Sequence, residues 1–299
     1  MSARVSEIAA AEAGTPIRRE PRFSWLWQLL RDPLGCFGLI LVCVIILSAV
    51  GADVLAPYDY KALDIKARLE PPSLTHLMGT DNLGRDTFSR ILYGGRIALS
   101  VALIAVGGSL MIGLVLGMLA GYGPRWLDNL VLLIFDAVRS FPYIMFALAV
   151  ITVVGPSLET IIFVVVVTSV PGYGRIVRSS TLSIRNTEFI LAERSLGAGV
   201  IRVLGQHVLP NVVAPLLILG SMDIPVVITF EAGLSFLGLG VKPPTPSWGS
   251  ILNDGFSFIR NTPWLVIAGG IPLIVTTLGF TFLGEALRDV FDPKLKKDR

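Results

Sequence analysis

The sequence is poor in charge. Only 16% of its 299 residues are Asp, Glu, Lys or Arg, whereas 53% are hydrophobic, and no lysine occurs between Ile97 and Val241. The mean hydropathy is +0.71. A soluble domain of this length cannot bury so much apolar surface, so the composition excludes an ordinary soluble protein. The net charge of +3 is modest, and we expect no nucleic acid among the partners.

Residues that bind metals or act as nucleophiles are also scarce. The chain has two cysteines, Cys36 and Cys43, and two histidines, His76 and His207. The cysteines are seven positions apart in one hydrophobic run, so they share a helix face and cannot easily form a disulfide. The patterns H-E-x-x-H, C-x-x-C and G-x-S-x-G are absent. We therefore predict neither catalytic residues nor a metal site.

A phosphate-binding loop is missing as well. The pattern GxxxxGK[ST] does not occur, because Gly is nowhere followed by Lys. Without that loop and its lysine, the chain has no recognisable means of holding the phosphates of ATP. We predict that this chain is not an enzyme and has no cofactor of its own.

The main feature that the sequence does have is a series of long hydrophobic runs. A helix needs about 20 apolar residues to cross a bilayer. Five arginines precede the first run, but the leader is long and the run exceeds the usual core of a signal peptide, which favours an uncleaved anchor. The runs predict an all-α integral membrane protein with six transmembrane helices, at about 34–56, 97–121, 130–153, 158–177, 211–232 and 264–284.

The distribution of Lys and Arg predicts the orientation. With both termini inside, the inner segments hold 15 of these residues and the outer segments seven. Positive residues favour the cytoplasmic side, so we predict an N-in, C-in topology. The predicted organisation is a cytoplasmic tail (1–33), a first transmembrane helix (34–56), an extracytoplasmic loop (57–95), a transmembrane core (96–285) with a cytoplasmic segment (185–210) and an outer loop (233–263), and a cytoplasmic tail (286–299).

The cytoplasmic segment has the pattern of a surface helix. Apolar and charged residues alternate at helical spacing from Thr187 to Val203. Gly197 and Gly199 each weaken a free helix by about 1 kcal/mol, which suggests a close contact at these positions. Pro210 is expected to end the polar stretch where the fifth span begins. A short helix across the inner face predicts a docking element, and a solvated linker is the alternative.

This segment resembles the cytoplasmic EAA loop of ABC importer permeases. That loop has the pattern Glu-Ala-Ala, a Gly four positions after the second Ala, and a Leu-Pro about a dozen residues beyond. Ala192, Gly197 and the pair Leu209-Pro210 match it. Leu191 replaces the first Glu, and Glu193 stands where the second Ala is usual.

Other stretches resemble the dipeptide/oligopeptide/nickel permease group. "GTDNLGRDTFSRILYGGRIALSVAL" (79–103) is similar to its signature before the second span, and "EAGLSFLGLGVKPPTPSWGSILNDG" (231–255) to its outer segment between spans five and six. "RDPLG" (31–35) and "FDPKL" (291–295) are similar to its ends. The likeness runs from about 31 to 295, and it is to the subunit that is paired with a second, homologous permease.

The resemblance implies a MetI-like multi-pass permease of the bacterial inner membrane. The implied partners are a second permease, two ATPase subunits that use ATP and Mg, an extracytoplasmic binding protein, and the lipid bilayer. The implied cargo is peptides or related solutes such as opines, nickel complexes or peptide conjugates. The residues implied to contact and couple the ATPase are Glu188, Ala192, Glu193, Arg194, Gly197, Leu209 and Pro210.

Charged residues inside the predicted spans are candidates for the pathway. Asp223 is costly near the middle of a span, so it faces either a water-filled pathway or a neighbouring helix of the partner permease. Pro225 is expected to kink the helix beside it. Asp136 and Arg139 are three positions apart, and we favour a mutual ion pair over a role in substrate binding.

The outer segment after the fifth span is too broken for a lipid-facing helix. It follows Glu231, a further pathway candidate, and predicts a re-entrant or capping loop that is either a gate or a lid. Trp248 and Trp264 are expected as anchors at the membrane interface. The candidate gate residues are Gly238, Gly240, Pro243, Pro244 and Trp248.

A stand-alone secondary transporter or channel is the alternative. Such carriers place broken helices and ionisable residues at corresponding positions of two repeats. No internal repeat is visible in this sequence, and six spans are few for such a carrier.

Overall fold

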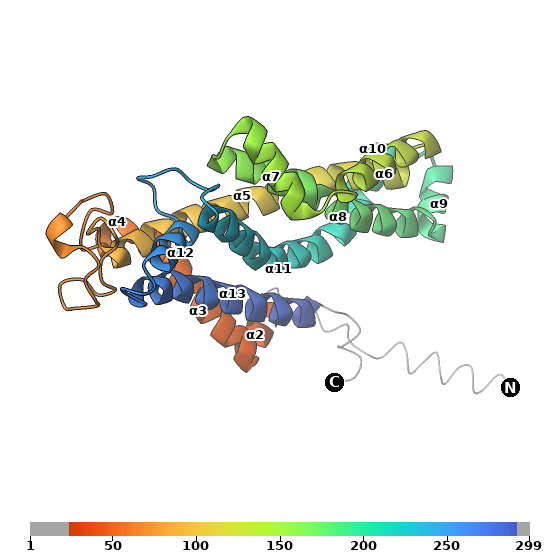
Figure 1. Cartoon of the computed structure of the whole chain (residues 1–299). Helices are drawn as coiled ribbons and strands as arrows, with labels where there is room; N and C mark the ends of the chain where they lie inside the picture. Colours follow the sequence, from red (N-terminus) through yellow and green to blue (C-terminus); the bar gives the residue numbers. More distant parts are fainter. Residues whose placement is uncertain (1–23, 292–299) are drawn as a thin grey trace.

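The computed structural model describes residues 24–291, and this part of the chain is helical (Figure 1). Within it, the only β-type pairing is an isolated bridge between Thr80 and Asp86. The predicted tail residues 1–23 and 292–299 lie outside the described residues. The helices are α2 (Ser24–Arg31), α3 (Pro33–Val50), α4 (Ala52–Leu55), the 3-10 turn η1 (Ile65–Ala67), α5 (Thr87–Tyr122), α6 (Arg125–Arg139), α7 (Tyr143–Val154), α8 (Leu158–Arg185), α9 (Glu188–Ser195), α10 (Val200–Val203), the π-helix η2 (Leu204–Val208), α11 (Leu209–Phe236), α12 (Trp248–Ser257) and α13 (Trp264–Phe291).

Five stretches are long and apolar enough to cross a membrane. They are α3, α5, α8, the continuous helix Val200–Phe236 and α13. A sixth span results if α6 and α7 are counted together, but these two helices meet at a bend of 84°. The predicted span 130–153 thus corresponds to this bent pair of helices. Pro142 explains the break, because it has no N–H and disfavours helical backbone at the residue before it.

Small residues let α5 and α8 approach each other closely. Gly113, Gly117 and Gly121 follow one another at helical spacing along α5. A Cβ atom at Gly117 would lie only 2.5 Å from the carbonyl oxygen of Gly174 on α8. Close backbone packing over small residues is a common way to hold membrane helices together. The pair α5–α8 is thus a rigid frame for the rest of the protein.

The main apolar core lies around α5. One fully or largely buried side chain from each of five helices illustrates it: Val42 on α3, Ala98 on α5, Val164 on α8, Ile228 on α11 and Trp248 on α12. Because distant parts of the sequence meet here, the core joins α12 to four of the spans.

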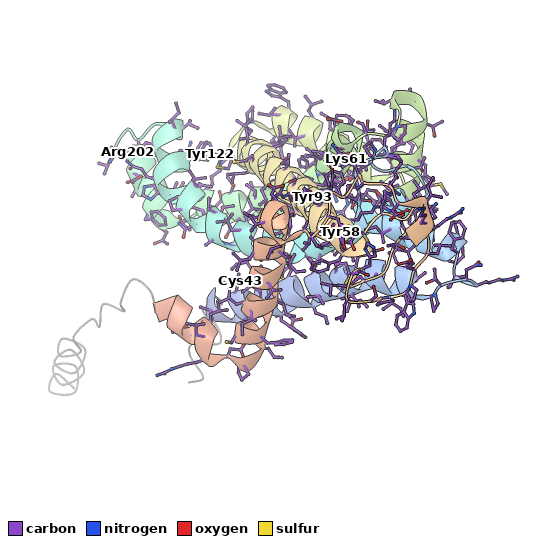
Figure 2. All side chains as sticks on the ribbon, turned by 90° about the vertical axis from the view of Figure 1, so that its left-hand side faces the viewer. Cys43, Tyr58, Lys61, Tyr93, Tyr122 and Arg202 are labelled. Carbon is purple, nitrogen blue, oxygen red and sulfur yellow. The ribbon has the colours of Figure 1, made fainter. Side chains whose placement is uncertain are left out.

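The two ends of the molecule differ in structure. In Figure 1, α4 and the loop after it lie at one end and α9 at the other, with α5 running between them. Figure 2 shows Tyr122 and Arg202 toward the α9 end and Tyr58, Tyr93 and Lys61 toward the opposite end. The predicted cytoplasmic segment and the predicted extracytoplasmic loop therefore lie on opposite sides of the helical bundle.

Candidate functional site

The segment predicted as one helix over 187–203 is two helices. α9 ends at Ser195, and α10 begins after Gly199. Gly197 has φ of +92°, a conformation that side chains with a Cβ rarely adopt, and this ends the first helix. A Cβ at Gly197 would meet nothing within 4 Å. Inside this chain the glycine is therefore needed for its backbone angle, whereas the expected close contact is a prediction about a partner.

Pro210 lies where the polar stretch gives way to the apolar fifth span, as expected, but it does not interrupt the helix. It lies in the first turn of α11, and the backbone is helical without a break from Val200 to Phe236. The π-helix Leu204–Val208 joins α10 to α11 at this point.

One face of α9 packs on His207 of the π-helix. Glu193 Oε2 lies 2.8 Å from His207 Nε2. The ring of Phe189, one turn earlier on α9, meets the His207 ring edge-on at 5.6 Å between centroids. Ile190 between them is fully buried. These contacts fasten α9 to the helix that continues as α11.

A second attachment ties α9 to the end of α5. The Arg194 guanidinium lies 6.0 Å from the centre of the Tyr122 ring, and Arg185 lies 5.5 Å from the same ring. Arg185 Nη1 also donates to the carbonyl oxygens of Gly121 and Tyr122, at 3.3 and 3.2 Å. A cation at the last carbonyls of a helix is favourable, so Arg185 caps α5 while it supports Tyr122.

The outward face of the segment is apolar and exposed. Leu196 is 89% exposed and Ile201 is 87% exposed. Neither was predicted as a coupling residue. Among the predicted coupling residues, Glu188, Ala192 and Arg194 are exposed, and Leu209 is half-buried. Contiguous exposed apolar side chains at one end of a protein are typical of a docking surface. The members of this exposed apolar face are Phe189, Leu191, Leu196, Val200 and Ile201.

Asp223 is half-buried on α11 and accepts a hydrogen bond from the Tyr173 hydroxyl on α8. Tyr173 was not predicted as a site residue, since no motif marks it. The hydroxyl gives the carboxylate a partner inside this chain, but it carries no positive charge. Within residues 24–291 Asp223 forms this hydrogen bond and no ion pair. Its predicted contact with the pathway or the partner permease stays a prediction.

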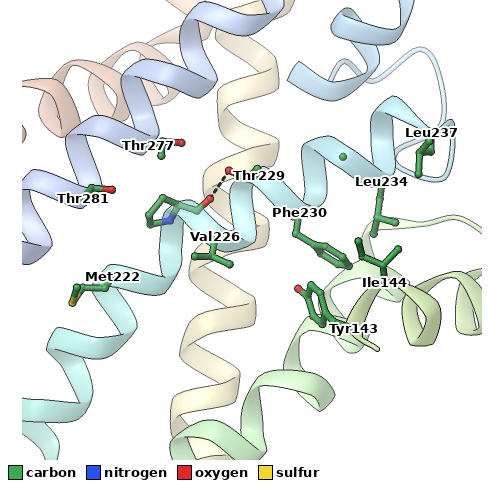
Figure 3. Close-up of a pocket in the computed structure, with 12 residues that line it drawn as sticks. Tyr143, Ile144, Met222, Val226, Thr229, Phe230, Leu234, Leu237, Thr277 and Thr281 are labelled. Atoms are coloured by element: carbon green, nitrogen blue, oxygen red, sulfur yellow. Dashed lines mark hydrogen bonds between the residues drawn. The ribbon is translucent and has the colours of Figure 1, made fainter. Parts of the chain in front are cut away.

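A cavity of about 600 Å³ lies along α11, and its lining includes Met222, the residue before Asp223 in the sequence (Figure 3). Its walls come from α7, α11 and α13, and they are mainly apolar. The rings of Tyr143 and Phe230 stack with centroids 4.1 Å apart on one side. The lining residues are Tyr143, Ile144, Met222, Pro225, Val226, Thr229, Phe230, Gly233, Leu234, Leu237, Thr277 and Thr281.

The expected ion pair between Asp136 and Arg139 is wrong. Asp136 pairs with Arg175 on α8 instead. Arg139 is exposed and forms no ion pair with any residue of the described range 24–291. A second arginine of α8, Arg178, pairs with Asp128 near the start of α6, with 2.6 Å between Nη2 and Oδ2. Two ion pairs from α8 thus hold α6, and spacing along α6 alone did not reveal them.

The outer loop contains a helix that folds back into the bundle. Trp248 begins this helix, α12, and is only 2% exposed, so its predicted place at the membrane interface is wrong. Its indole Nε1 donates to the carbonyl oxygen of Ile91 at 3.0 Å. Trp264, in contrast, is 47% exposed at the start of α13. The burial of Trp248 fixes α12 against α5.

The turn before α12 is closely packed. Glu231 is fully buried, and Ser235 Oγ donates to its Oε1 at 2.6 Å. A Cβ atom at Gly240 would lie 1.8 Å from Ser235 Oγ. Gly238 has φ of +77°, and the bond between Pro243 and Pro244 is cis. The predicted gate residues are therefore joined in one compact turn over the outer end of α11.

A buried cluster of charged residues connects α12 to α5 and to the loop before α5. Arg85 Nε donates to Asp81 Oδ2 at 2.6 Å, and Arg90 donates to both Asp81 and Asp254, the latter at 3.2 Å. Asp81, Arg85 and Arg90 are buried. Burial raises the pKa of Asp254, although Arg90 acts in the opposite direction. No pattern in the sequence marks this cluster, because its members lie on the loop before α5, on α5 and on α12.

Comparison with known proteins identifies the family. The family described as "Binding-protein-dependent transport system inner membrane component" matches residues 113–297. The "N-terminal TM domain of oligopeptide transport permease C" matches residues 24–72. These two matches together take in most of the helices described above.

Three relatives are similar over nearly their full length. The dipeptide transport system permease protein DppC of Alkalihalophilus pseudofirmus is 40% identical over 90% of this chain and 88% of its own. The glutathione transport system permease protein GsiD of Pectobacterium atrosepticum is 38% identical over 95% and 96%. The oligopeptide transport system permease protein OppC of Bacillus subtilis is 35% identical over 97% of each.

A solved structure shows the same fold. The inward-facing MetNI methionine ABC transporter has a chain that matches with a TM-score of 0.54 and 20% identity, covering 67% of this chain and 95% of that one. The helical bundle of this chain thus has a known fold. Together with the family matches and the relatives, this shows that the chain belongs to the family of inner membrane components of binding-protein-dependent transport systems, as a multi-pass permease subunit of an ABC importer.

Proposed function

We propose that this permease moves peptides or closely related small solutes into the cell, in an importer with a second permease, two ATPase subunits and an extracytoplasmic binding protein. The relatives named for dipeptides, glutathione and oligopeptides support this class of cargo. The observation that carries the proposal is the exposed apolar face of α9 and α10, which is attached to α11 through His207.

ATP and Mg belong to the partner subunits in this proposal. The chain has no phosphate-binding loop. In this proposal the free energy of ATP hydrolysis is therefore transmitted to it through its contact with the ATPase subunits. The exposed apolar face is suited to a groove on an ATPase, where it would be shielded from water. Glu188 and Arg194, which are exposed beside it, are placed to form the polar rim of that contact.

The pathway is assigned to the side of α11 that carries Asp223 and the adjoining cavity. The cavity is largely apolar, and the hydroxyl-bearing residues Thr229, Thr277 and Thr281 are part of its lining. A carboxylate on a helix that lines such a cavity favours the amino group of a peptide. The second permease would supply the opposite wall, which places the pathway between two subunits.

The outer gate is assigned to the turn from Glu231 to Trp248 and to α12. This turn closes over the outer end of α11, and the charge cluster ties it to the extracytoplasmic loop. A binding protein that docks on that loop would thereby contact the element that covers the pathway. Orientation with both termini in the cytoplasm follows from the positive charges and fits these assignments.

Reconstitution tests the proposal. The chain is co-expressed with its candidate partner subunits, inserted into proteoliposomes and supplied with a radiolabelled dipeptide and the binding protein. ATP-dependent uptake that requires this chain is expected. Uptake driven by an ion gradient, without ATPase subunits, would favour the stand-alone transporter instead.

A further inference from the structure

We propose that Glu193 and His207 are positioning residues that make α9 move together with the fifth span, so that motion of a docked ATPase reaches α11 directly. The proposal rests on the proposed function, because it concerns how the docking face is connected to the pathway helix. It begins from the 2.8 Å contact between Glu193 Oε2 and His207 Nε2.

The contact bridges a turn that is itself open. Between the two residues lie the end of α9, the turn with Gly197 and Gly199, and α10. A Cβ atom at either glycine would meet nothing within 4 Å, so no neighbouring atoms restrain the turn at these two positions. Apart from the pair, α9 is held to the π-helix by the contact of Phe189 with the His207 ring and by buried Ile190. The pair adds a polar contact to these apolar ones and so stiffens the connection between α9 and α11.

The environment of the pair favours a firm contact. Glu193 Oε2 and His207 Nε2 are both shielded from solvent, and neither makes a hydrogen bond of ordinary geometry within the described residues. Their mutual approach at 2.8 Å is therefore a close charge or dipole contact. Phe189 covers the His207 ring from the preceding turn of α9. Because a buried polar atom without a partner is costly, removing either residue would leave the other without this close polar neighbour.

His207 is placed on an unusual turn of the helix. Val208, Val212 and Leu216 are buried at α-helical intervals of four, whereas the preceding fully buried residue is Val203, five positions back. The π-helix accounts for this longer interval. One added residue rotates the chain before it by about 100° relative to an uninterrupted α-helix. The pair thus pins α9 at the turn that sets the rotation of α10 relative to α11.

Glu193 departs from the EAA-loop pattern, and this departure suggests variants that test the role of the Glu193–His207 pair. The pattern has Ala at the position of Glu193, so Glu193→Ala installs a side chain that this position accepts in similar permeases. The variants are Glu193→Ala, His207→Ala, the double change, and the exchange of Glu193→His with His207→Glu. Gln206→Ala is the matched control, because Gln206 is exposed on the same turn and its one side-chain hydrogen bond within the described residues is from Arg202.

The experiment measures three quantities on the full complex in proteoliposomes: co-purification of the ATPase subunits, ATP hydrolysis, and dipeptide uptake. For each single variant we expect uptake per ATP hydrolysed to fall about tenfold, within the range for residues in direct contact. The double variant should be no worse than either single one, and the exchange should restore most of the coupling. The Gln206→Ala complex should match the wild type.

The outcomes separate the two proposals. Failure of the wild-type chain to co-purify with ATPases, or uptake without ATP, would contradict the proposed function. A coupled wild type with equally coupled single variants would overturn the role of the pair alone. Additive losses in the double variant, or an exchange that restores nothing, would show that the residues act separately and would also overturn it.

Discussion

The Tyr173 hydroxyl on α8 donates a hydrogen bond to the Asp223 carboxylate on α11. This contact links the rigid α5–α8 frame to the helix that carries the candidate pathway. A tyrosine hydroxyl satisfies the carboxylate as a hydrogen-bond donor but brings no positive charge to it. The consequences of this arrangement, and of three others, can be measured.

The first prediction concerns the charge of Asp223. Asp223→Asn should lower the uptake of a cationic peptide about tenfold and that of a neutral one much less, because one favourable charge interaction of about 1.4 kcal/mol is lost. Uptake of both peptides by reconstituted complex is the measurement. Tyr173→Phe is the control, since it removes the hydrogen bond and keeps the carboxylate. An Asp223→Cys thiol that never reacts with aqueous reagents would contradict the pathway assignment.

The second prediction concerns Gly197. Gly197→Ala should strain the turn by about 1 kcal/mol, because a Cβ disfavours its positive φ. Gly197→Trp should in addition obstruct ATPase docking, so that co-purification falls or hydrolysis continues without uptake. Gly199→Ala is the matched control, since Gly199 has an ordinary extended backbone with φ of −74°. Normal uptake by an intact Gly197→Trp complex would mean that the segment is only a linker, as would a loss traced solely to failed membrane insertion.

The third prediction concerns Arg90. Arg90→Ala should destabilise the outer region by about 3 kcal/mol, because Asp81 would lose one of its two cations while fully buried. Thermal unfolding of the purified protein in detergent measures this loss. Arg96→Ala, which removes the exposed pair with Asp53, should cost much less. Equal melting temperatures for the two variants would argue against a stabilising role of the buried cluster.

The fourth prediction concerns the pH dependence of Asp254. Burial raises its pKa in the folded protein above the value of 3.8 for an exposed carboxyl. A raised pKa means that folding favours the protonated form, so its contribution to stability is present below pH 3.8 and is lost as the pH rises through the folded pKa. The wild type should therefore lose stability relative to Asp254→Asn as the pH increases over that interval. Parallel unfolding curves of the two proteins across the interval would contradict the raised pKa.

Local patterns in the sequence determined the class of the protein and the place of most elements. The hydrophobic runs predicted the membrane fold, because the length of an apolar run is a local property that the bilayer alone constrains. The loop pattern and the long matches on either side predicted the permease family, which the comparisons confirmed. The position of the docking segment was likewise visible from its alternation of charged and apolar residues.

The tertiary structure decided which side chains meet. Asp136 pairs with Arg175 and not with Arg139, because packing of α6 on α8 brings a nearer cation than its own helix offers. Trp248 is buried on Ile91 and not at the interface, since α12 turns back into the bundle. Glu193 contacts His207 because the turn at Gly197 and the π-helix Leu204–Val208 fold the chain back on itself. Sequence periodicity fixes the face of a single helix, but contacts between helices depend on how their backbones pack, and that is set by the whole fold.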